Sequence, residues 1–181
     1  MRAAGINIRK AERREADRIG AMQELSFCSL GAAHYAPQAI ASYIRQIGTF
    51  DPALIDEGHY FVAIDGPGEI VGTGGWSRLP PAYGQGEAQP AGRHMATIRS
   101  VFVAPSATRR GIGSAIMRHT EADAGGDGVT MLLLTATLSG VPLYAALGYR
   151  AAKRREIMLP DGARLDFLDM DKPIAGQADA A

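Results

Sequence analysis

A short segment rich in glycine and arginine has the residue types of an anion-binding loop. It runs from Thr108 to Ser114 and reads TRRGIGS. The first turn of a helix has unpaired backbone N–H groups and a partial positive charge. Glycine there lets a phosphate approach the backbone without hindrance from a Cβ atom, and the arginines add full positive charge. The segment therefore predicts a diphosphate-binding site, with ordinary turn glycines as the alternative.

Two well-known phosphate-binding motifs do not match this segment. A nucleotide-hydrolysing P-loop needs Lys followed by Ser or Thr after its second glycine, whereas Gly113 is followed by Ser114 and Ala115. A dinucleotide-binding fold needs glycine or alanine three residues after the second glycine, and Ile116 stands there. The sequence therefore argues against both classes.

The segment lies between a predicted strand and a predicted helix. Residues 97–103 (TIRSVFV) are typical of a strand, and a helix is expected from Gly111 to about residue 124. Residues 129–136 (VTMLLLTA) form a continuous apolar run, which indicates a strand covered on both faces. Strand, helix and strand in this order predict a parallel pair with a right-handed crossover.

The rest of the chain predicts the elements that surround this unit. Periodicity and turn residues indicate a strand at 6–8, helices over 12–25 and from Pro37, hairpin strands 60–64 and 70–76, a short helix around 142–147, and strands 151–158 and 164–170. The predicted fold class is α/β, with a mixed, mostly antiparallel sheet, a central parallel βαβ pair and flanking helices. Residues 1–173 are expected to form a single domain, and residues 174–181 a disordered tail. Residues 78–94 are predicted to form a long surface loop.

Composition limits the classes of function. The 181 residues include 19 that are Lys or Arg and 19 that are Asp or Glu. The chain therefore lacks the cationic field of a nucleic-acid-binding protein. Cys28 is the only cysteine, which excludes an intrachain disulfide or a multi-cysteine metal site, and no metal is expected. The first residues lack an apolar signal core, and the uncharged stretch 128–149 is interrupted by Gly140 and Pro142. We therefore expect a cytoplasmic protein without a membrane partner.

Two stretches resemble the GNAT superfamily of acyl-CoA-dependent N-acyltransferases. They are SVFVAPSATRRGIGSAIM at 100–117 and PLYAALGY at 142–149. The family motif is Arg or Gln, two residues, Gly, one residue, then Gly or Ala. Gly111 and Gly113 match it, whereas Thr108 occupies the Arg/Gln position and the adjacent arginines are expected to supply the charge. The resemblance implies acetyl-CoA or coenzyme A as co-substrate, with the diphosphate held by Thr108, Arg109, Arg110, Gly111, Ile112, Gly113 and Ser114.

The resemblance also implies that Val101, Phe102 and Val103 offer backbone groups to the pantetheine arm, as a partner strand would. A physical reason supports this expectation. A parallel pair that diverges at a bulge leaves unpaired N–H and C=O groups, which an amide-bearing arm can satisfy. One such N–H can also polarise the thioester carbonyl.

Tyr144 is the residue for which the resemblance implies a catalytic role, beside the coenzyme sulfur. A leaving thiolate has a pKa near ~8.5, so a phenol can protonate it as the C–S bond breaks. Without the resemblance, Tyr144 would be interpreted as a packing aromatic.

The group that deprotonates the amine is left open by the sequence. Members of the family often carry a glutamate on the strand corresponding to 97–103, but here that strand offers Thr97 and Arg99 and no acid. His94, Glu87, His34 and a chain of water molecules are the alternatives.

The predicted function is transfer of an acetyl or short acyl group from acetyl-CoA to a primary amine, by direct attack in a ternary complex. The acceptor is a small-molecule or peptide amine, and a homodimer is implied by resemblance alone. A non-catalytic sensor of coenzyme A or acyl-CoA on the same fold is the first alternative. An interaction protein without a small-molecule site is the second.

Overall fold

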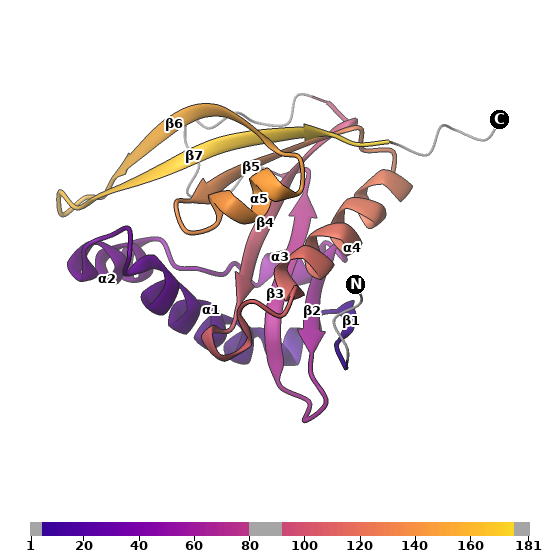
Figure 1. Ribbon diagram of the computed structural model, residues 1–181, viewed down its shortest axis with the longest axis horizontal. Coiled ribbons are helices and arrows are strands. Elements are labelled where there is room, and N and C mark those ends of the chain that lie inside the picture. Colours follow the sequence, from indigo (N-terminus) through magenta and orange to yellow (C-terminus); the bar gives the residue numbers. More distant parts are fainter. Residues whose placement is uncertain (1–4, 80–91, 176–181) are drawn as a thin grey trace.

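The computed structural model of the protein describes residues 5–79 and 92–175, which build a single seven-stranded sheet with helices on both faces (Figure 1). The strands are β1 (Asn7–Lys10), β2 (Tyr60–Ile64), β3 (Ile70–Ser77), β4 (Met95–Val103), β5 (Met131–Thr137), β6 (Arg150–Met158) and β7 (Arg164–Pro173). Their spatial order is β1-β2-β3-β4-β5-β7-β6. β4 and β5 pair in parallel, and the other neighbouring strands pair antiparallel. The predicted fold class is confirmed.

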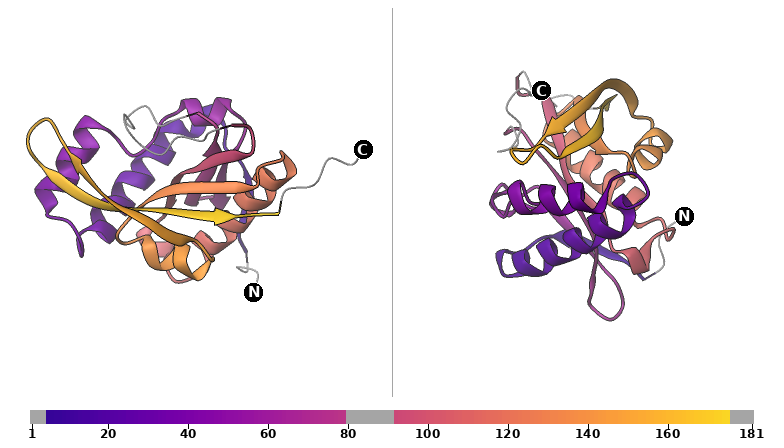
Figure 2. Two further views of the ribbon diagram at one scale, coloured as in Figure 1. Left: turned by 90° about the horizontal axis from the view of Figure 1, so that it is seen from above. Right: turned by 90° about the vertical axis from the view of Figure 1, so that its left-hand side faces the viewer.

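The helices lie in two groups. They are α1 (Ala16–Gly31), α2 (Pro37–Gln46), α3 (Ala53–Asp56), α4 (Ile112–Gly126) and α5 (Val141–Ala146), with 3-10 turns η1 (Arg13–Glu15) and η2 (Pro105–Ala107). Figure 2 shows α1 and α2 on one side of the sheet and α4 and α5 on the other. Two differences from the sequence prediction concern the ends and the number of the helices. α1 continues beyond residue 25, because Phe27 joins the core and is 3% exposed, and α3 was not predicted.

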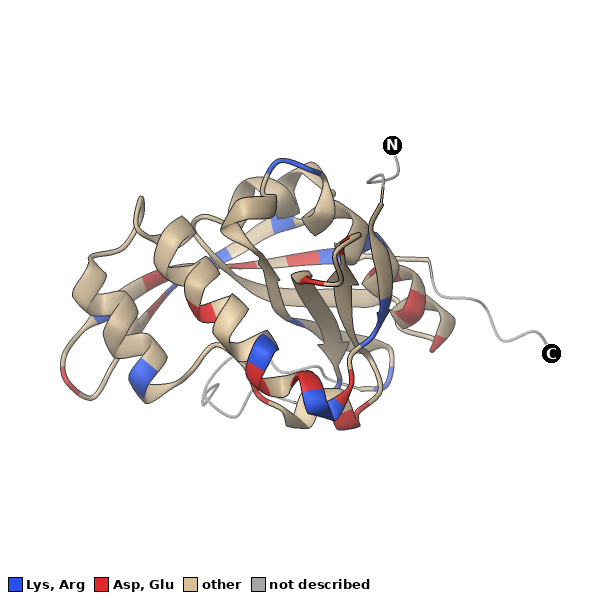
Figure 3. Ribbon diagram, turned by 90° about the horizontal axis from the view of Figure 1, so that it is seen from below, with Lys and Arg blue, Asp and Glu red and all other residues tan. Residues whose placement is uncertain are grey.

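Basic and acidic residues are interspersed where η1 and α1 begin, as Figure 3 shows. Arg9 donates two hydrogen bonds to Glu15, and Arg13 pairs with Asp56 at 2.6 Å. The Arg9 hydrogen bond lowers the pKa of Glu15, whose carboxylate also accepts from the Glu12 amide. The Arg9–Glu15 contact ties η1, immediately before α1, to β1, and the Arg13–Asp56 pair ties η1 to α3.

β3 lies between α1 and α4, and its residues alternate between the two. Thr73 faces α1, where its hydroxyl accepts a hydrogen bond from Gln23. Gly72 and Gly74 face α4: a Cβ atom at either position would lie 2.6 or 2.7 Å from the nearest Ile116 side-chain atom. The missing side chains let α4 pack directly against the centre of the sheet.

β4 and β5 separate partway along their length. Their parallel pairing extends from Met95↔Met131 to Thr97↔Leu133. Beyond these pairs, β4 continues beside β3 as far as Val103, and β5 continues beside β7 as far as Thr137. The expected divergence is confirmed, and it opens the sheet at its centre.

The C-terminal segment leaves the sheet beside α4. The amide of Ile174 donates to the carbonyl of Thr130, and its side chain packs against the cluster that contains Leu132 and Met170. Most of the tail expected at 174–181 lies outside the described residues. Within those residues, no helix has the length and apolar character needed to cross a bilayer.

Candidate functional site

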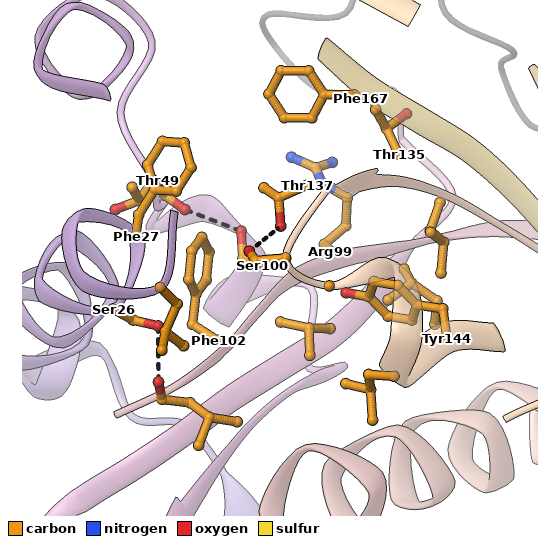
Figure 4. Close-up of a pocket in the computed structure, with 18 of the residues that line it drawn as sticks. Ser26, Phe27, Thr49, Arg99, Ser100, Phe102, Thr135, Thr137, Tyr144 and Phe167 are labelled. Atoms are coloured by element: carbon orange, nitrogen blue, oxygen red, sulfur yellow. Dashed lines mark hydrogen bonds between the residues drawn. The ribbon is translucent and has the colours of Figure 1, made fainter. Parts of the chain in front are cut away.

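A pocket fills the opening between β4 and β5 (Figure 4). Residues 97–103 of β4 form one wall, and Leu134, Thr135 and Thr137 of β5 form the other. The rest of the lining comes from α1, Tyr43 of α2, the segment around Thr49, the turn at Ser139 and Gly140, α5, and Phe167 of β7. Four residues that the sequence singled out therefore lie together at this pocket: Val101, Phe102, Val103 and Tyr144.

The wall formed by β4 contains a bulge. Thr73 of β3 lies opposite Phe102, whereas Gly75 lies opposite Arg99, so β4 has one extra residue between these pairs. Ser100 within the bulge has a φ of 49°, in the left-handed region that residues other than glycine rarely adopt. A bulge of this kind turns backbone groups out of the ladder and makes them available to a ligand.

A buried polar network fixes the bulge. The Ser100 carbonyl accepts hydrogen bonds from the Tyr60 hydroxyl at 3.0 Å and the Thr73 hydroxyl at 3.1 Å. Gln23 Nε2 donates to the hydroxyl oxygens of Tyr60 and Thr73, at 2.6 and 3.0 Å. Burial raises the pKa of Tyr60, which keeps the phenol protonated as a donor. Sequence reasoning missed this network, whose only sequence signal is a glutamine inside an otherwise apolar helix stripe.

The predicted phosphate loop lies just outside the pocket lining. Arg109, Arg110 and Gly111 are exposed, and α4 begins immediately after them. The first intrahelical bond joins the Ala115 amide to the Gly111 carbonyl, so the three preceding amides lie in the free first turn.

Gly113 connects the loop to the pocket. A Cβ atom there would lie 3.0 Å from Leu143 Cδ2 and 3.5 Å from Val103 Cγ2, and both of these residues line the pocket. Because glycine occupies the position, α4 begins in close contact with the Val103 end of β4. The amides of the free first turn and two exposed arginines thus lie where the pocket ends.

Three other residues of the predicted loop have side chains that are bonded within the protein or partly or fully buried. The Thr108 hydroxyl donates to the Pro105 carbonyl at 3.1 Å and so closes the η2 turn. The Ile112 side chain is 1% exposed and packs in the core, which leaves only its backbone amide for a ligand. Ser114 is half-buried in the first turn of α4. Their roles toward a diphosphate stay predictions.

Tyr144 is 8% exposed, and its ring lines the pocket. Gly140 makes room for the ring, since a Cβ atom there would lie 3.0 Å from Tyr144 Cε2. Burial raises the pKa of Tyr144, so the phenol stays protonated at neutral pH. Among residues 5–79 and 92–175, the Tyr144 hydroxyl has no hydrogen-bond partner. The proton is therefore available to a molecule in the pocket.

Neither histidine proposed as a base lies at this site. His94 stands before β4, with its Nδ1 3.3 Å from the Gly128 carbonyl, and His34 follows α1; neither lines the pocket. Glu87 lies outside the described residues. The described pocket lining contains no Asp, Glu or His, and its polar side chains are mainly hydroxyls.

Arg99 is the site residue that sequence reasoning did not assign. Its side chain lines the pocket although the residue is only 5% exposed. The signal available in the sequence was a charged residue in the middle of a predicted central strand. Across the parts of the chain that the structure describes, no group of three potential metal-ligating side chains occurs.

Comparisons with known proteins agree with this geometry. A sequence model described as the acetyltransferase (GNAT) family matches residues 21–149. A GCN5-related N-acetyltransferase from Rhodopseudomonas palustris has a similar structure, with a TM-score of 0.71 and 22% identity, over 96% of this chain and 99% of that one.

Two further structures share the fold. PaiA N-acetyltransferase from Thermoplasma acidophilum, solved in complex with coenzyme A, has a TM-score of 0.69 and 16% identity, over 93% of this chain and 99% of that one. A phosphinothricin acetyltransferase from Sinorhizobium meliloti, in complex with AcCoA, has a TM-score of 0.65 and 19% identity, over 98% of this chain and 92% of that one. No curated protein matches the sequence significantly. Because the family model spans well over half of its length, the chain belongs to the GNAT family of acetyltransferases.

Proposed function

We propose that this acetyltransferase moves an acetyl or short acyl group from acetyl-CoA to a primary amine by direct attack. The observation that carries the proposal is the opened β4–β5 pair, with the bulge at Ser100 on one wall and the Tyr144 phenol in the same pocket. The coenzyme complexes of the two similar structures support the choice of co-substrate.

The pocket and the loop before α4 support one arrangement of acetyl-CoA. The diphosphate fits the first-turn amides of 112–114, which have no intrahelical acceptor, beside Arg109 and Arg110, and the pantetheine arm extends from there along Val103, Phe102 and Val101. A β4 amide that β5 does not pair can donate to the thioester oxygen and stabilise the tetrahedral intermediate.

Chemistry in this arrangement needs a neutral amine and a proton for the leaving sulfur. The amine nitrogen attacks the thioester carbon and forms a tetrahedral intermediate, whose C–S bond then breaks while the Tyr144 hydroxyl donates its proton to the thiolate. The acylated nitrogen loses one proton, which returns through water to the Tyr144 phenolate. The ammonium form of the acceptor first loses a proton to water, because the described lining offers no carboxylate or imidazole. The products are the N-acyl amine and free coenzyme A.

The test combines binding with turnover. A ligand at 100 times its Kd adds about 2.7 kcal/mol to stability, so acetyl-CoA is expected to raise the melting temperature clearly. Thiol release with a panel of primary amines then measures transfer. If coenzyme A causes no shift at saturating concentration, the proposal fails.

A coenzyme A or acyl-CoA sensor is the second candidate, favoured by the absence of an acid or histidine from the described pocket lining. Tight binding of acetyl-CoA without thiol release for any amine in the panel would select the sensor. Measurable release above the rate of hydrolysis would select the enzyme.

A further inference from the structure

Four polar groups on the α1 face of the sheet form one hydrogen-bonded unit with a single direction. The Ser100 carbonyl accepts from the hydroxyls of Tyr60 and Thr73, at 3.0 and 3.1 Å. Each hydroxyl has one proton to donate, so its remaining contact must be to a donor. Gln23 supplies both through the two protons of its Nε2 group. An amide rotated the other way would present an acceptor to both hydroxyls and draw their protons away from Ser100.

Packing alone does not explain this buried unit. Gln23 and Thr73 are 0% exposed and Tyr60 is 1% exposed, and Gln23 Oε1 has no hydrogen-bond partner among the described residues. Gln23 lies on the face of α1 that also buries Ile19 and Phe27. An apolar side chain there would pack without the cost of removing an amide from water. The glutamine is accounted for by the direction that it gives to the two hydroxyls and, through them, to the Ser100 carbonyl.

The direction of the Ser100 carbonyl determines the direction of the next amide. The peptide bond between Ser100 and Val101 is trans and planar, so the Val101 N–H points opposite to the Ser100 C=O. The carbonyl points to the face on which Gln23 and Thr73 meet. The Val101 N–H therefore points toward the other face of the sheet, where α4 and α5 pack (Figure 2) and Tyr144 lines the pocket.

Val101 lies where the sheet has opened. The pairing of β4 with β5 ends at Thr97↔Leu133, before it reaches Val101, and Val101 lines the pocket. A Cβ atom at Gly74, which faces α4, would lie 3.1 Å from Val101 Cγ2, so Val101 is on the same side as α4. A donor that is fixed in direction before the substrate binds needs no reorganisation when negative charge develops on the thioester oxygen.

We propose that Gln23, Tyr60 and Thr73 are positioning residues for the transfer. They hold the Ser100 carbonyl on the α1 face and so aim the Val101 amide at the thioester oxygen. The inference rests on the proposed acyl transfer and adds to it three residues that do not line the pocket. When the amine attacks, the electron pair of the thioester C=O moves to its oxygen, and the Val101 N–H stabilises that charge until the C–S bond breaks. Loss of a hydroxyl from the network lets the peptide unit rotate and weakens this contact.

Removing one hydroxyl tests the network with little change of shape. Thr73→Val is expected to lower kcat about 10- to 100-fold, because the amide is misaligned rather than lost. The Kd of coenzyme A, which has no thioester carbonyl, is expected to stay within about twofold. Tyr60→Phe keeps the ring and is the second variant, with the same expected split between kcat and Kd. Thr73→Ser keeps a hydroxyl and is expected to retain kcat to within about threefold of the unaltered protein.

The stretching frequency of the thioester carbonyl reports the contact without turnover. It is measured by infrared difference spectroscopy on bound acetyl-CoA that carries ¹³C at the carbonyl carbon. A hydrogen bond from the Val101 amide polarises the C=O bond and lowers its frequency in the unaltered protein. Thr73→Val and Tyr60→Phe are expected to raise the frequency, and Thr73→Ser to leave it near that of the unaltered protein. The measurement needs no acceptor, so it separates this inference from the proposed function.

Thr120→Val is the matched control. It makes the same change at a threonine of α4 that is also 0% exposed, does not line the pocket and has a hydroxyl without a partner in the described chain. It should alter neither kcat nor the carbonyl frequency. Unchanged kcat and frequency in both Thr73→Val and Tyr60→Phe would overturn the inference. An equal loss of coenzyme A binding and turnover would also overturn it, because the network would then only support the fold. A raised frequency in both variants would support the inference even if no amine were acylated.

Discussion

Tyr144 combines a buried phenol with an open pocket. Its ring packs edge-on against Tyr149, with centroids 5.8 Å apart, while its hydroxyl has no recorded partner in the described chain. Packing alone would be satisfied by phenylalanine. The hydroxyl is thus free to donate to a ligand, as the proposed transfer requires.

Replacing that hydroxyl separates packing from chemistry. Tyr144→Phe keeps the ring and is expected to lower kcat by about 100-fold, the lower range for a positioned general acid, while the Kd of acetyl-CoA stays within about twofold. Steady-state kinetics and calorimetry measure the two quantities. A parallel loss of binding and turnover would instead mean that Tyr144 supports the coenzyme site structurally.

Other residues show where sequence reasoning stops. Glycines and arginines before a helix have a local physical meaning, so the sequence alone could predict a phosphate-binding role for 108–114, which stays a prediction. Arg99 and Gln23 acquire their roles only through what lies beside them: a bulge in β4 and two hydroxyls from β2 and β3. No local pattern in either segment encodes that proximity.

The packing of α4 against β3 determines where the phosphate loop lies. Gly72 carries no side chain at the contact, and a Cβ atom there would lie 2.6 Å from Ile116 Cδ1 and 2.8 Å from Ile112 Cγ2. Ile112 is the first residue of α4, so a displacement at this contact moves the amides that follow it.

A methyl group at that contact tests the link between packing and binding. Gly72→Ala is expected to lower the free energy of unfolding by about 1–3 kcal/mol through overpacking, and to weaken coenzyme A binding because the start of α4 shifts. Urea unfolding and calorimetry measure the two effects. Gly66→Ala, in the β2–β3 turn with no atom within 4 Å of the added Cβ, is the control and should change neither.

The sequence predicted most of the helices and strands but not where they begin and end. The hairpin of β2 and β3, the α4 helix and the strands after it follow from periodicity and turn residues. The extension of α1 and the short α3 depend on tertiary contacts, because Phe27 and Leu54 are buried only once other elements cover them. The bulge at Ser100 likewise follows from pairing with β3.

Seen as a whole, the molecule has two parts that meet at one short ladder. β1 to β4 form a continuous antiparallel sheet, as do β5, β7 and β6, and the three parallel pairs of β4 and β5 join them. The pocket lies where that ladder ends. Its lining therefore comes from both parts, and its shape depends on the intact fold.

Buried tyrosines in both parts predict how stability responds to alkaline pH. Burial raises the pKa of Tyr60, Tyr144 and Tyr149 above the ordinary value. Above pH 10 the unfolded chain loses these protons while the folded chain keeps them. The free energy of unfolding is therefore fully retained below the ordinary pKa and decreases as pH rises above it.

The expected decrease in the free energy of unfolding follows from the linkage between proton binding and folding. At pH 10.5, each tyrosine that ionises only when unfolded lowers the free energy of unfolding by about 0.8 kcal/mol, given an ordinary pKa near ~10. Urea unfolding at pH 8 and at pH 10.5 measures how much free energy of unfolding is lost between these two pH values. The loss should be smaller by about the same amount in Tyr144→Phe than in the unaltered protein. Because lysines also titrate in this range, only the difference between the two proteins is diagnostic. An identical loss in both would show that the Tyr144 phenol ionises equally well in the folded protein, and that it is not held as the neutral acid on which the transfer mechanism depends.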